Sequence, residues 1–417
     1  MSSHGNPLIN QNDNRPLLGG ENVTVFDRWL ANKLMQVIGM PQINLVLWND
    51  EMIYKSPNSV ATMKLHDRSA MFKIISNPDI NAGDLYSTGR LTIDGDLIRF
   101  LEVVYKSLDE ASKHSWFTRV IASWQQRPRP NSMSRSLDNI HHHYDLGNDF
   151  YRLWLDKEAM QYTCAYYPSA EASLEEAQQA KMHHIARKLQ LKPGDKVVEA
   201  GCGWGGLARF MAKNYGVQVS SFNISREQIA YARDKAKQQG LSAQVDYIED
   251  DYRNIKGKYD VFVSVGMLEH VGVDNFAPLG EVVNRCLKKD GRGLIHSIGR
   301  NRPKLMNGWI ERRIFPGAYP PSLKEMMNIF EPYDFSVLDV ENIRLHYART
   351  LKHWLERFDQ HQVEINEMFD ENFIRAWRLY LAGSIAAFTT GDLQLFQIVF
   401  NRRESNQVPW TREHIYQ

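Results

Sequence analysis

The chain has 417 residues, which is long for one ordinary domain and predicts two. Hydrophobic residues make up 43% and the formal net charge is +1, an ordinary globular composition that gives no indication of nucleic-acid binding. No apolar run reaches the roughly 18 residues that a membrane span requires. The three cysteines, at positions 164, 202 and 286, form no C-x-x-C pair, which favours a reducing, cytoplasmic compartment.

The first third of the chain carries no catalytic constellation. Residues 1–21 are polar and lack the basic-then-apolar order of a signal peptide, so we expect a flexible arm. Residues 22–120 predict an α+β accessory domain that serves lipid binding, dimerisation or neither. Its apolar spacing indicates helices at 26–39, 70–76 and 97–108 and strands at 44–48 and 61–65.

A linker and a histidine cluster follow. Residues 121–140 are Pro-, Ser- and Arg-containing with little periodicity, and their basic groups either touch a membrane or are solvated. His141, His142 and His143 are adjacent, so their side chains diverge and one metal ion cannot easily collect all three. No metal site is expected. Ser173 and Glu176 have the spacing of a capping box and predict the start of a helix.

The stretch Lys196–Leu207 reads K-V-V-E-A-G-C-G-W-G-G-L, a buried-type strand, a glycine loop and the start of a helix. Glycine allows a ligand to approach the backbone closely, and a helix N-terminus offers unpaired N–H groups. A dinucleotide site requires G-x-G-x-x-G and a later acid, whereas the next strand here ends at Phe222-Asn223. The string resembles the cofactor loop of S-adenosylmethionine (SAM) methyltransferases; the alternative is a glycine-rich turn without a ligand.

Strands and helices continue to alternate after this loop, which predicts an α/β fold with a mostly parallel sheet and helices on both faces. Ligands bind at the carboxyl ends of the strands in such sheets. The expected later strands are 217–221, 245–249, 259–265, 292–298, 335–340 and 396–401.

Six motifs in one order make the resemblance more specific. They are His143–Asp149, Gln161–Tyr166, Glu176–Lys181, Gly201–Gly206, Ser264–His270 and His296–Gly299. Together they resemble the cyclopropane fatty acid synthases, whose relatives include the mycolic acid cyclopropane synthases. The match runs from about 141 to 403, and residues 22–120 are more loosely similar to that family's lipid-associated domain. The resemblance implies that 141–417 is a SAM-dependent methyltransferase domain with a Rossmann-like, seven-stranded, mostly parallel sheet.

The cofactor residues are assigned from this resemblance. Gly201, Gly203 and Gly205 would lie under the methionine part of SAM, with Glu199 in place of the commoner aspartate. For Asp251 the alternative is a helix cap. The ribose and adenine are expected to meet Asn223, Ser225, Gln228, Asp251, Tyr252 and Arg253, and Tyr162 and Thr163 would close over the cofactor.

The chemistry of the implied reaction selects a second set. A cis alkene is a poor nucleophile, so the methyl donor must be held in line in a dry site. Attack produces a carbocation, and ring closure needs a base. The resemblance implies that a bicarbonate ion serves as that base, bound by Glu269, His296 and Tyr347, with Cys164 and Ile298 contributing mainly backbone groups. The alternative for His296 is a satisfied core histidine.

Two further hypotheses concern single side chains. Cys164 as a nucleophile is disfavoured, because no His–acid pair is assigned to activate it. Aromatic faces could stabilise the cation, and one or two of six candidates are expected to do so. The six are Tyr166, Tyr167, Trp309, Phe315, Tyr319 and Trp354.

The expected partners are membrane phospholipids with unsaturated acyl chains, reached by peripheral contact with the cytoplasmic face, and we expect a homodimer. Residues 300–319 mix basic and apolar groups, which suits either an anionic bilayer surface or a loop over the substrate channel. Helices at 345–358 and 371–389 either wall an acyl tunnel or pack on the sheet. Other readings are methylation of an unsaturated lipid without ring closure, and SAM or lipid binding without turnover.

Overall fold

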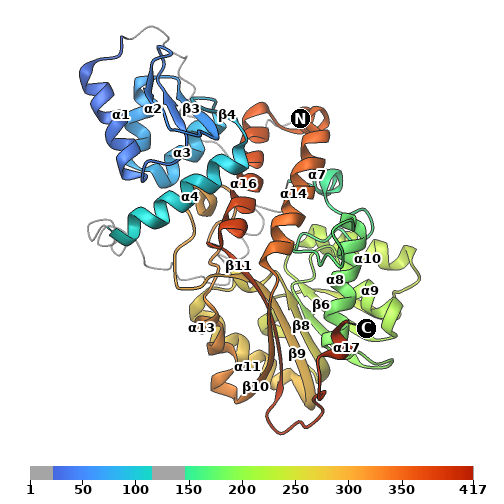
Figure 1. The fold of residues 1–417 in the computed structure, drawn as a ribbon. Helices are drawn as coiled ribbons and strands as arrows, with labels where there is room; N and C mark the ends of the chain where they lie inside the picture. The colour runs from blue at the N-terminus through green and yellow to red at the C-terminus, as the bar shows by residue number, and fades with distance from the viewer. Residues whose placement is uncertain (1–21, 115–145, 417) are drawn as a thin grey trace. The chain divides into compact units, whose positions relative to one another are not determined.

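The structure, a computed structural model, describes residues 22–114 and 146–416. The predicted arm at 1–21, the linker at 121–140 and the three adjacent histidines lie outside the described residues. Contacts within the chain form two compact units, which are described separately (Figure 1). None of the helices in the described ranges combines the length and apolarity needed to cross a membrane.

The two units differ from the predicted domain boundaries in their membership. Among the described residues, the first unit contains 22–114 together with 306–316 and 351–392, and the second contains 146–305, 317–350 and 393–416. The assignment of 141–417 to one catalytic domain remains a prediction about function. One late helix, at 371–390, nevertheless packs against helices formed by the N-terminal residues, which no local pattern in the sequence could indicate.

The first unit contains a small sheet of four strands in the order β2-β1-β3-β4. β1 and β3 are parallel, and the two outer pairs are antiparallel. The strand β2, the helix α3 and the strand β4 were not predicted. The elements are α1 (Val25–Val37), β1 (Asn44–Val46), β2 (Met52–Tyr54), β3 (Ala61–Leu65), α2 (Arg68–Ser76), α3 (Pro78–Ser87), β4 (Leu91–Gly95) and α4 (Leu97–His114).

Later segments complete this unit. α16 (Glu371–Thr390) packs on α3 and α4, and α15 (Gln362–Met368) packs on α16. α12 (Gly308–Arg313) packs on α3, where Trp309 is buried and its Nε1 donates to Asp84 Oδ1 at 3.1 Å. Arg313 forms an ion pair with the same carboxylate at 2.8 Å. Trp309 and Arg313 are therefore engaged within the unit, and contact of residues 300–319 with a bilayer or with a substrate channel remains a prediction.

The second unit is built on a seven-stranded sheet in the order β10-β11-β9-β8-β5-β6-β7. β11 is antiparallel to both neighbours and all other pairs are parallel. This confirms the predicted fold class. The strands are β5 (Lys196–Ala200), β6 (Gln218–Asn223), β7 (Val245–Glu249), β8 (Tyr259–Val265), β9 (Leu287–Gly299), β10 (Phe335–Asn342) and β11 (Gln394–Arg402).

Helices cover both faces of this sheet (Figure 1). Successive strand residues point to opposite faces, so Val197 joins the core under α8, α9 and α10, while Val198 joins the core under α11. The predicted capping box is present: Ser173 caps α8 and Glu176 bonds back to it. The helices are α7 (Asn148–Trp154), α8 (Leu174–Lys188), α9 (Gly206–Tyr215), α10 (Arg226–Gln238), α11 (Phe276–Cys286), α13 (Leu323–Met326) and α17 (Glu413–Tyr416).

α14 (Arg344–Gln360) is continuous along the chain from the second unit into the first, and its first turns belong to the second unit. The carboxyl ends of β5, β6, β8 and β9 lie at one edge of the sheet, because these strands are parallel neighbours. Glu199, Gly203, Asn223, Glu269 and His296 lie at or just after these ends.

Candidate active site

The glycine loop between β5 and α9 adopts backbone conformations that favour glycine. Gly201, Gly203 and Gly205 have φ of 86°, 51° and 74°. A Cβ on Gly205 would come within 2.5 Å of the Tyr247 ring, so that glycine is needed for packing. A Cβ on Gly203 would meet nothing within 4 Å. Gly203 therefore leaves its backbone open, next to the N-terminus of α9, where a ligand can approach.

Glu199 supplies a buried carboxylate immediately before this loop. It is 2% exposed, and its Oε2 accepts a hydrogen bond from Ser221 Oγ at 2.6 Å. Burial raises the pKa of Glu199 to about 7, although Ser221 and the nearby Lys181 and Arg209 counteract that effect. A positive group bound beside Glu199 would lower its pKa and stabilise the carboxylate form.

Asn223 and Gln228 connect the next strand and helix to the glycine loop. Asn223 Nδ2 donates to Gly203 O at 3.2 Å and to Gln228 Oε1 at 2.8 Å. Gln228 Nε2 is buried and has no hydrogen-bond partner within the described ranges. Ser225 is the N-cap of α10 and accepts from the Gln228 amide. The structure therefore brings these three residues together and leaves one amide donor available.

Asp251 does what a helix cap does. It precedes a short 3-10 turn, and its Oδ1 accepts from the Arg253 amide at 2.9 Å. Arg253 Nε lies 3.5 Å from the same carboxylate, and its guanidinium lies over the Tyr252 ring at 5.3 Å. The helix cap, which was the alternative interpretation of Asp251, is thus observed. Contact of these three residues with adenine remains a prediction.

Tyr162 and Thr163 lie in a segment held by a buried lysine that the sequence analysis missed. Lys181 Nζ donates to Thr163 Oγ1 at 3.0 Å and to Gln161 Oε1. Burial lowers the pKa of Lys181 to about 8 despite the acidic groups around it. Tyr162 packs on Tyr151, with ring centroids 5.5 Å apart. The signal for Lys181 was present: a lysine four residues before Ile185 lies on the apolar face of α8.

These residues fit SAM. An anionic Glu199 suits the positively charged amino group of the methionine part, the Gln228 amide suits a ribose hydroxyl, and the open Gly203 backbone admits a ligand. When bound, SAM would supply an electrophilic methyl group on a sulfonium.

A second polar group follows β8 and β9. Glu269 is 6% exposed and lies in a 3-10 turn, Leu268–His270, that follows β8. Its Oε1 accepts the Ile298 amide at 2.5 Å, whereas its Oε2 is buried without a partner among the described residues. Burial raises the pKa of Glu269 to about 7. The structure thus joins Glu269 and Ile298 directly.

His296 lies two residues before Ile298 on the same strand, so both side chains point to one face. It is 1% exposed, and its Nδ1 is 3.1 Å from Gln397 Nε2. Its Nε2 is buried and, within 22–114 and 146–416, has no partner. Burial, together with nearby positive charge, holds the pKa of His296 well below its usual value. His296 is therefore not a satisfied core histidine, because one ring nitrogen is unused.

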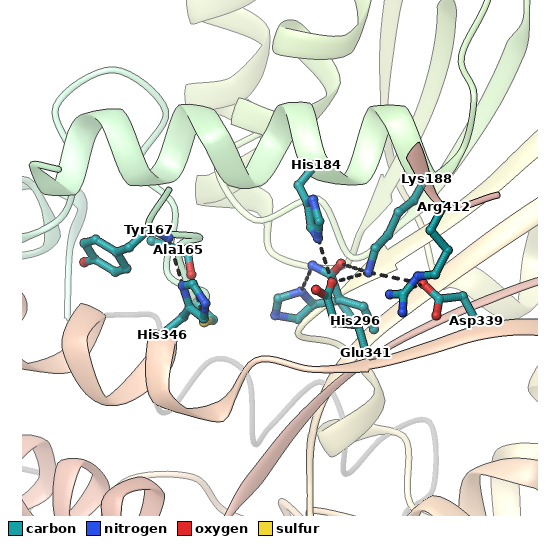
Figure 2. Close-up of polar contacts among 11 residues, drawn as sticks. Ala165, Tyr167, His184, Lys188, His296, Asp339, Glu341, His346 and Arg412 are labelled. Carbon is teal, nitrogen blue, oxygen red and sulfur yellow. Dashed lines mark hydrogen bonds and ion pairs between the residues drawn. The ribbon is translucent and has the colours of Figure 1, made fainter. Parts of the chain in front are cut away.

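Cys164 and Tyr347 lie where α14 meets the segment after Cys164. The Cys164 thiol is fully buried and donates to Ala165 O at 3.1 Å, and burial raises its pKa well above the usual value. The Ala165 amide donates to Thr350 Oγ1 at 3.0 Å, and Tyr347, on the same helix, is 8% exposed. On the same helix, His346 Nδ1 accepts the Tyr167 amide at 2.9 Å (Figure 2). A buried, protonated thiol is a poor nucleophile.

The aromatic candidates are divided between the units. Tyr166 is stacked between two imidazoles, with ring centroids 4.2 Å from His184 and 4.8 Å from His346. Tyr167 and Tyr319 also belong to the second unit, whereas Trp309, Phe315 and Trp354 belong to the first. A role for any of them near a cation remains a prediction.

Comparison with known proteins gives the family. The family model for mycolic acid cyclopropane synthetase matches residues 131–398. A probable fatty acid methyltransferase of Pseudomonas putida is 34% identical over 395 residues, which cover 92% of this chain and 98% of that protein. A cyclopropane-fatty-acyl-phospholipid synthase of Escherichia coli K12 is 34% identical over 383 residues, 90% of this chain and 98% of that protein.

Solved structures agree with this match. A crystal structure of mycolic acid cyclopropane synthase CmaA1 in complex with SAH and CTAB superposes with a TM-score of 0.60 at 27% identity. It covers 63% of this chain and 97% of that one. The chain therefore belongs to the mycolic acid cyclopropane synthetase family and is a SAM-dependent methyltransferase.

Proposed function

We propose that this chain is a cyclopropane fatty acid synthase, which transfers the methyl group of SAM to the cis double bond of a phospholipid acyl chain and closes a ring. One observation carries the proposal: Glu269 Oε2 and His296 Nε2 are buried, without partners in the described part of the chain, at the same edge of the sheet as the glycine loop. Unsatisfied buried polar atoms are costly, so they mark a place for a polar species.

Within this proposal, Glu269 is the acceptor. Its carboxylate is held by the Ile298 amide through one oxygen, which leaves the other oxygen to receive a proton or an O–H donor. Ile298 was expected to contribute a backbone group to a bound ion. Since the Ile298 amide N–H donates to Glu269 in this structure, we propose that Ile298 orients the Glu269 carboxylate. The burial of both groups excludes water, which protects a cationic transition state from hydration.

A bicarbonate ion suits the remaining groups. Its O–H can be accepted by Glu269, and its oxygens can be bound by His296 and Tyr347 as donors, with the backbone beside Cys164 nearby. When bound there it would supply a base for the proton released on ring closure. In this scheme Glu199, Gly201, Gly203, Gly205, Asn223, Ser225 and Gln228 hold SAM, with Tyr162, Thr163, Asp251, Tyr252 and Arg253 around its adenosine part.

Contact with the membrane is proposed for an apolar patch on the first unit. Val25, Phe26, Trp29 and Phe72 are 79%, 56%, 54% and 45% exposed. Phe26 stacks on Trp29 and on Phe72 at 5.8 and 6.5 Å. Exposed aromatic groups of this kind suit a bilayer interface. Phe26→Ser with Trp29→Ser should reduce sedimentation with phospholipid vesicles, and unchanged sedimentation would reject this surface.

The cytoplasmic location and the homodimer remain predictions. Light scattering of the purified chain measures its mass, and replacement of Phe26 and Trp29 shows whether the same patch holds two copies together.

Mass spectrometry of membrane lipids tests the function. The chain is expressed in a bacterial host that lacks such an enzyme, and the acyl chains are compared with those of the empty host. A gain of CH₂ with loss of the double bond supports the proposal. Unchanged lipids, despite folded and SAM-binding protein, would indicate a binding protein without turnover.

A second function keeps the methyl transfer and changes the product. The Pseudomonas putida relative is named a probable fatty acid methyltransferase, which specifies no ring. The same lipid analysis separates the two: a methyl branch or a retained olefin indicates transfer without ring closure. The unused Glu269 oxygen does not separate the two products, because the carbocation must lose a proton to a base whether the ring closes or an olefin re-forms.

A further inference from the structure

A row of buried polar side chains runs from His296 to α8 and β10. His296 Nδ1 is 3.1 Å from Gln397 Nε2, and Gln397 Oε1 is 2.8 Å from Lys188 Nζ. Lys188 Nζ also contacts Glu341 Oε2 at 2.5 Å, and His184 Nε2 meets the same oxygen at 2.6 Å. Figure 2 shows His184, Lys188, His296 and Glu341 converging from separate elements of the second unit. Apart from His296, no member of this row has a role in the proposed chemistry.

The lysine fixes the orientation of the glutamine. An ammonium group has donors and no acceptor, so Lys188 can bond only to the oxygen of the Gln397 amide. The amide nitrogen must then face His296. Since an amide nitrogen only donates, His296 Nδ1 must accept, and the ring proton must be on Nε2. The donors and acceptors of Lys188, Gln397 and His296 therefore select the Nε2–H tautomer of His296.

The electrostatics of the row support this arrangement. The Lys188 side chain is fully buried, and it keeps a counter-charge because Glu341 lies against it. Burial by itself would raise the pKa of Glu341, but the hydrogen bond from His184 and the charge of Lys188 lower it to about 2. Burial and the positive groups on α8 also keep His296 neutral, so its ring has a single proton to place.

We propose that Gln397, held by Lys188, is a positioning residue that fixes His296 as the Nε2–H tautomer and so presents a hydrogen-bond donor to the reacting site. This rests on the proposed function of Glu269 and His296. It divides their roles: Glu269 accepts, and His296 donates. An imidazole of the other tautomer would present a lone pair to an anion and repel it.

The alternative is that the row only ties α8 to β10 and β11. With such a structural role, substitutions in the row would lower the stability of the fold, and the position of the His296 proton would have no effect on activity. Gln397→Glu separates the two roles, because glutamate keeps the size of the side chain and its contact with Lys188. It presents an acceptor to His296 Nδ1, which must then carry a proton.

The experiment combines kinetics with ¹⁵N NMR of histidine-labelled full-length protein, and the His296 signals are identified by their absence from His296→Gln. Wild type should carry the proton on Nε2, with Nδ1 unprotonated. Gln397→Glu should protonate Nδ1 and lower kcat on the order of tenfold to a hundredfold, with KM for SAM and the unfolding midpoint unchanged. Gln394→Glu is the matched control: it is 4% exposed on the same strand and accepts from Asn342, a bond that glutamate retains.

Two results would overturn the proposal: a proton on Nδ1 in wild type, or wild-type kcat in Gln397→Glu. If Gln397→Glu does not fold, Lys188→Met replaces it. Loss of the ammonium frees the amide to rotate, so both tautomers should appear and kcat should fall, and a single Nε2–H tautomer with wild-type kcat would contradict the role of Lys188. The NMR measurement reports the tautomer of His296 whether or not the protein turns over substrate. If the wild-type protein modifies no olefinic lipid, the proposed function is rejected, and the NMR result still decides which tautomer is present.

Discussion

The loop after β5 and the polar group around β9 use the same edge of one sheet in different ways. The loop is a continuous stretch whose backbone is opened by Gly203, and its neighbours are short polar groups on the next strand and helix. The group around β9 is assembled from Glu269, His296, Gln397 and Lys188, which lie on four separate elements.

The two regions differ in the kind of groups that each ligand needs. A cofactor with many polar atoms can be held by open backbone and by a few side-chain groups on adjacent elements. A small anion in a dry site needs groups that are buried, unpaired at one atom and fixed at the others, as Glu269 and His296 are. Substitutions in the second region should therefore affect kcat, and those in the first should affect SAM binding.

The largest effect is expected from Glu269→Gln, which removes the carboxylate that accepts the O–H of the anion in the proposed site. We expect kcat to fall by about 10²- to 10³-fold while the dissociation constant for SAM is unchanged. Turnover of olefinic phospholipid and calorimetric SAM titration measure the two quantities. Glu249→Gln, at the exposed end of β7, is the control. If Glu269→Gln weakened SAM binding by as large a factor as it lowered kcat, the two regions would not have separate roles.

Gly203→Ala probes the cofactor region, and Gly194→Ala is its control. Both glycines have positive φ and open space where a Cβ would go, so both variants should lose about 1–2 kcal/mol of unfolding free energy. Only Gly203→Ala should also weaken SAM binding, by about tenfold, because its Cβ enters the ligand approach. Denaturant melts and SAM titration are sufficient. Similar SAM affinity in both variants would show that the loop does not contact the cofactor.

The pH dependence should have opposite signs for activity and stability. Glu269 acts as a carboxylate and its pKa is raised to about 7 by burial, so kcat should fall about tenfold per pH unit below 7. A raised pKa stabilises the fold most below the ordinary value of 4.5, and this contribution is lost as pH rises through 7. Glu269→Gln should flatten the kcat profile and reduce the slope of the stability profile, to which Glu199 still contributes. Since Glu199 also titrates near 7, the SAM dissociation constant is followed over the same range.

The smallest effect is expected from Cys164→Ser. The thiol is buried, bonded to its neighbour's carbonyl and held protonated, so serine can replace it and most of kcat should remain. The native protein should also react slowly with thiol reagents at neutral pH. A loss of kcat comparable with that of Glu269→Gln, without loss of folding, would support a thiol mechanism and contradict the assignment of the anion site.

The sequence determined the sheet and the cofactor loop. Strand order in the chain, buried strand patterns and the glycine spacing are local signals, so the seven strands, the capping box at Ser173 and the loop after β5 were predicted where they occur. The late helices were also predicted, but the packing of α16 on α3 and α4 was not, because an apolar helix face does not indicate which element will cover it.

The tertiary structure decided which polar groups are joined and which atoms are left unused. Glutamine at 397 and lysine at 188 lie 209 positions apart, and no periodicity relates them. Their contact exists because β11 enters the sheet beside β9 and α8 covers that face, which places an amide between an ammonium and an imidazole. The residue types were readable in the chain, whereas the position of a single proton on His296 depends on distances that only the folded protein sets.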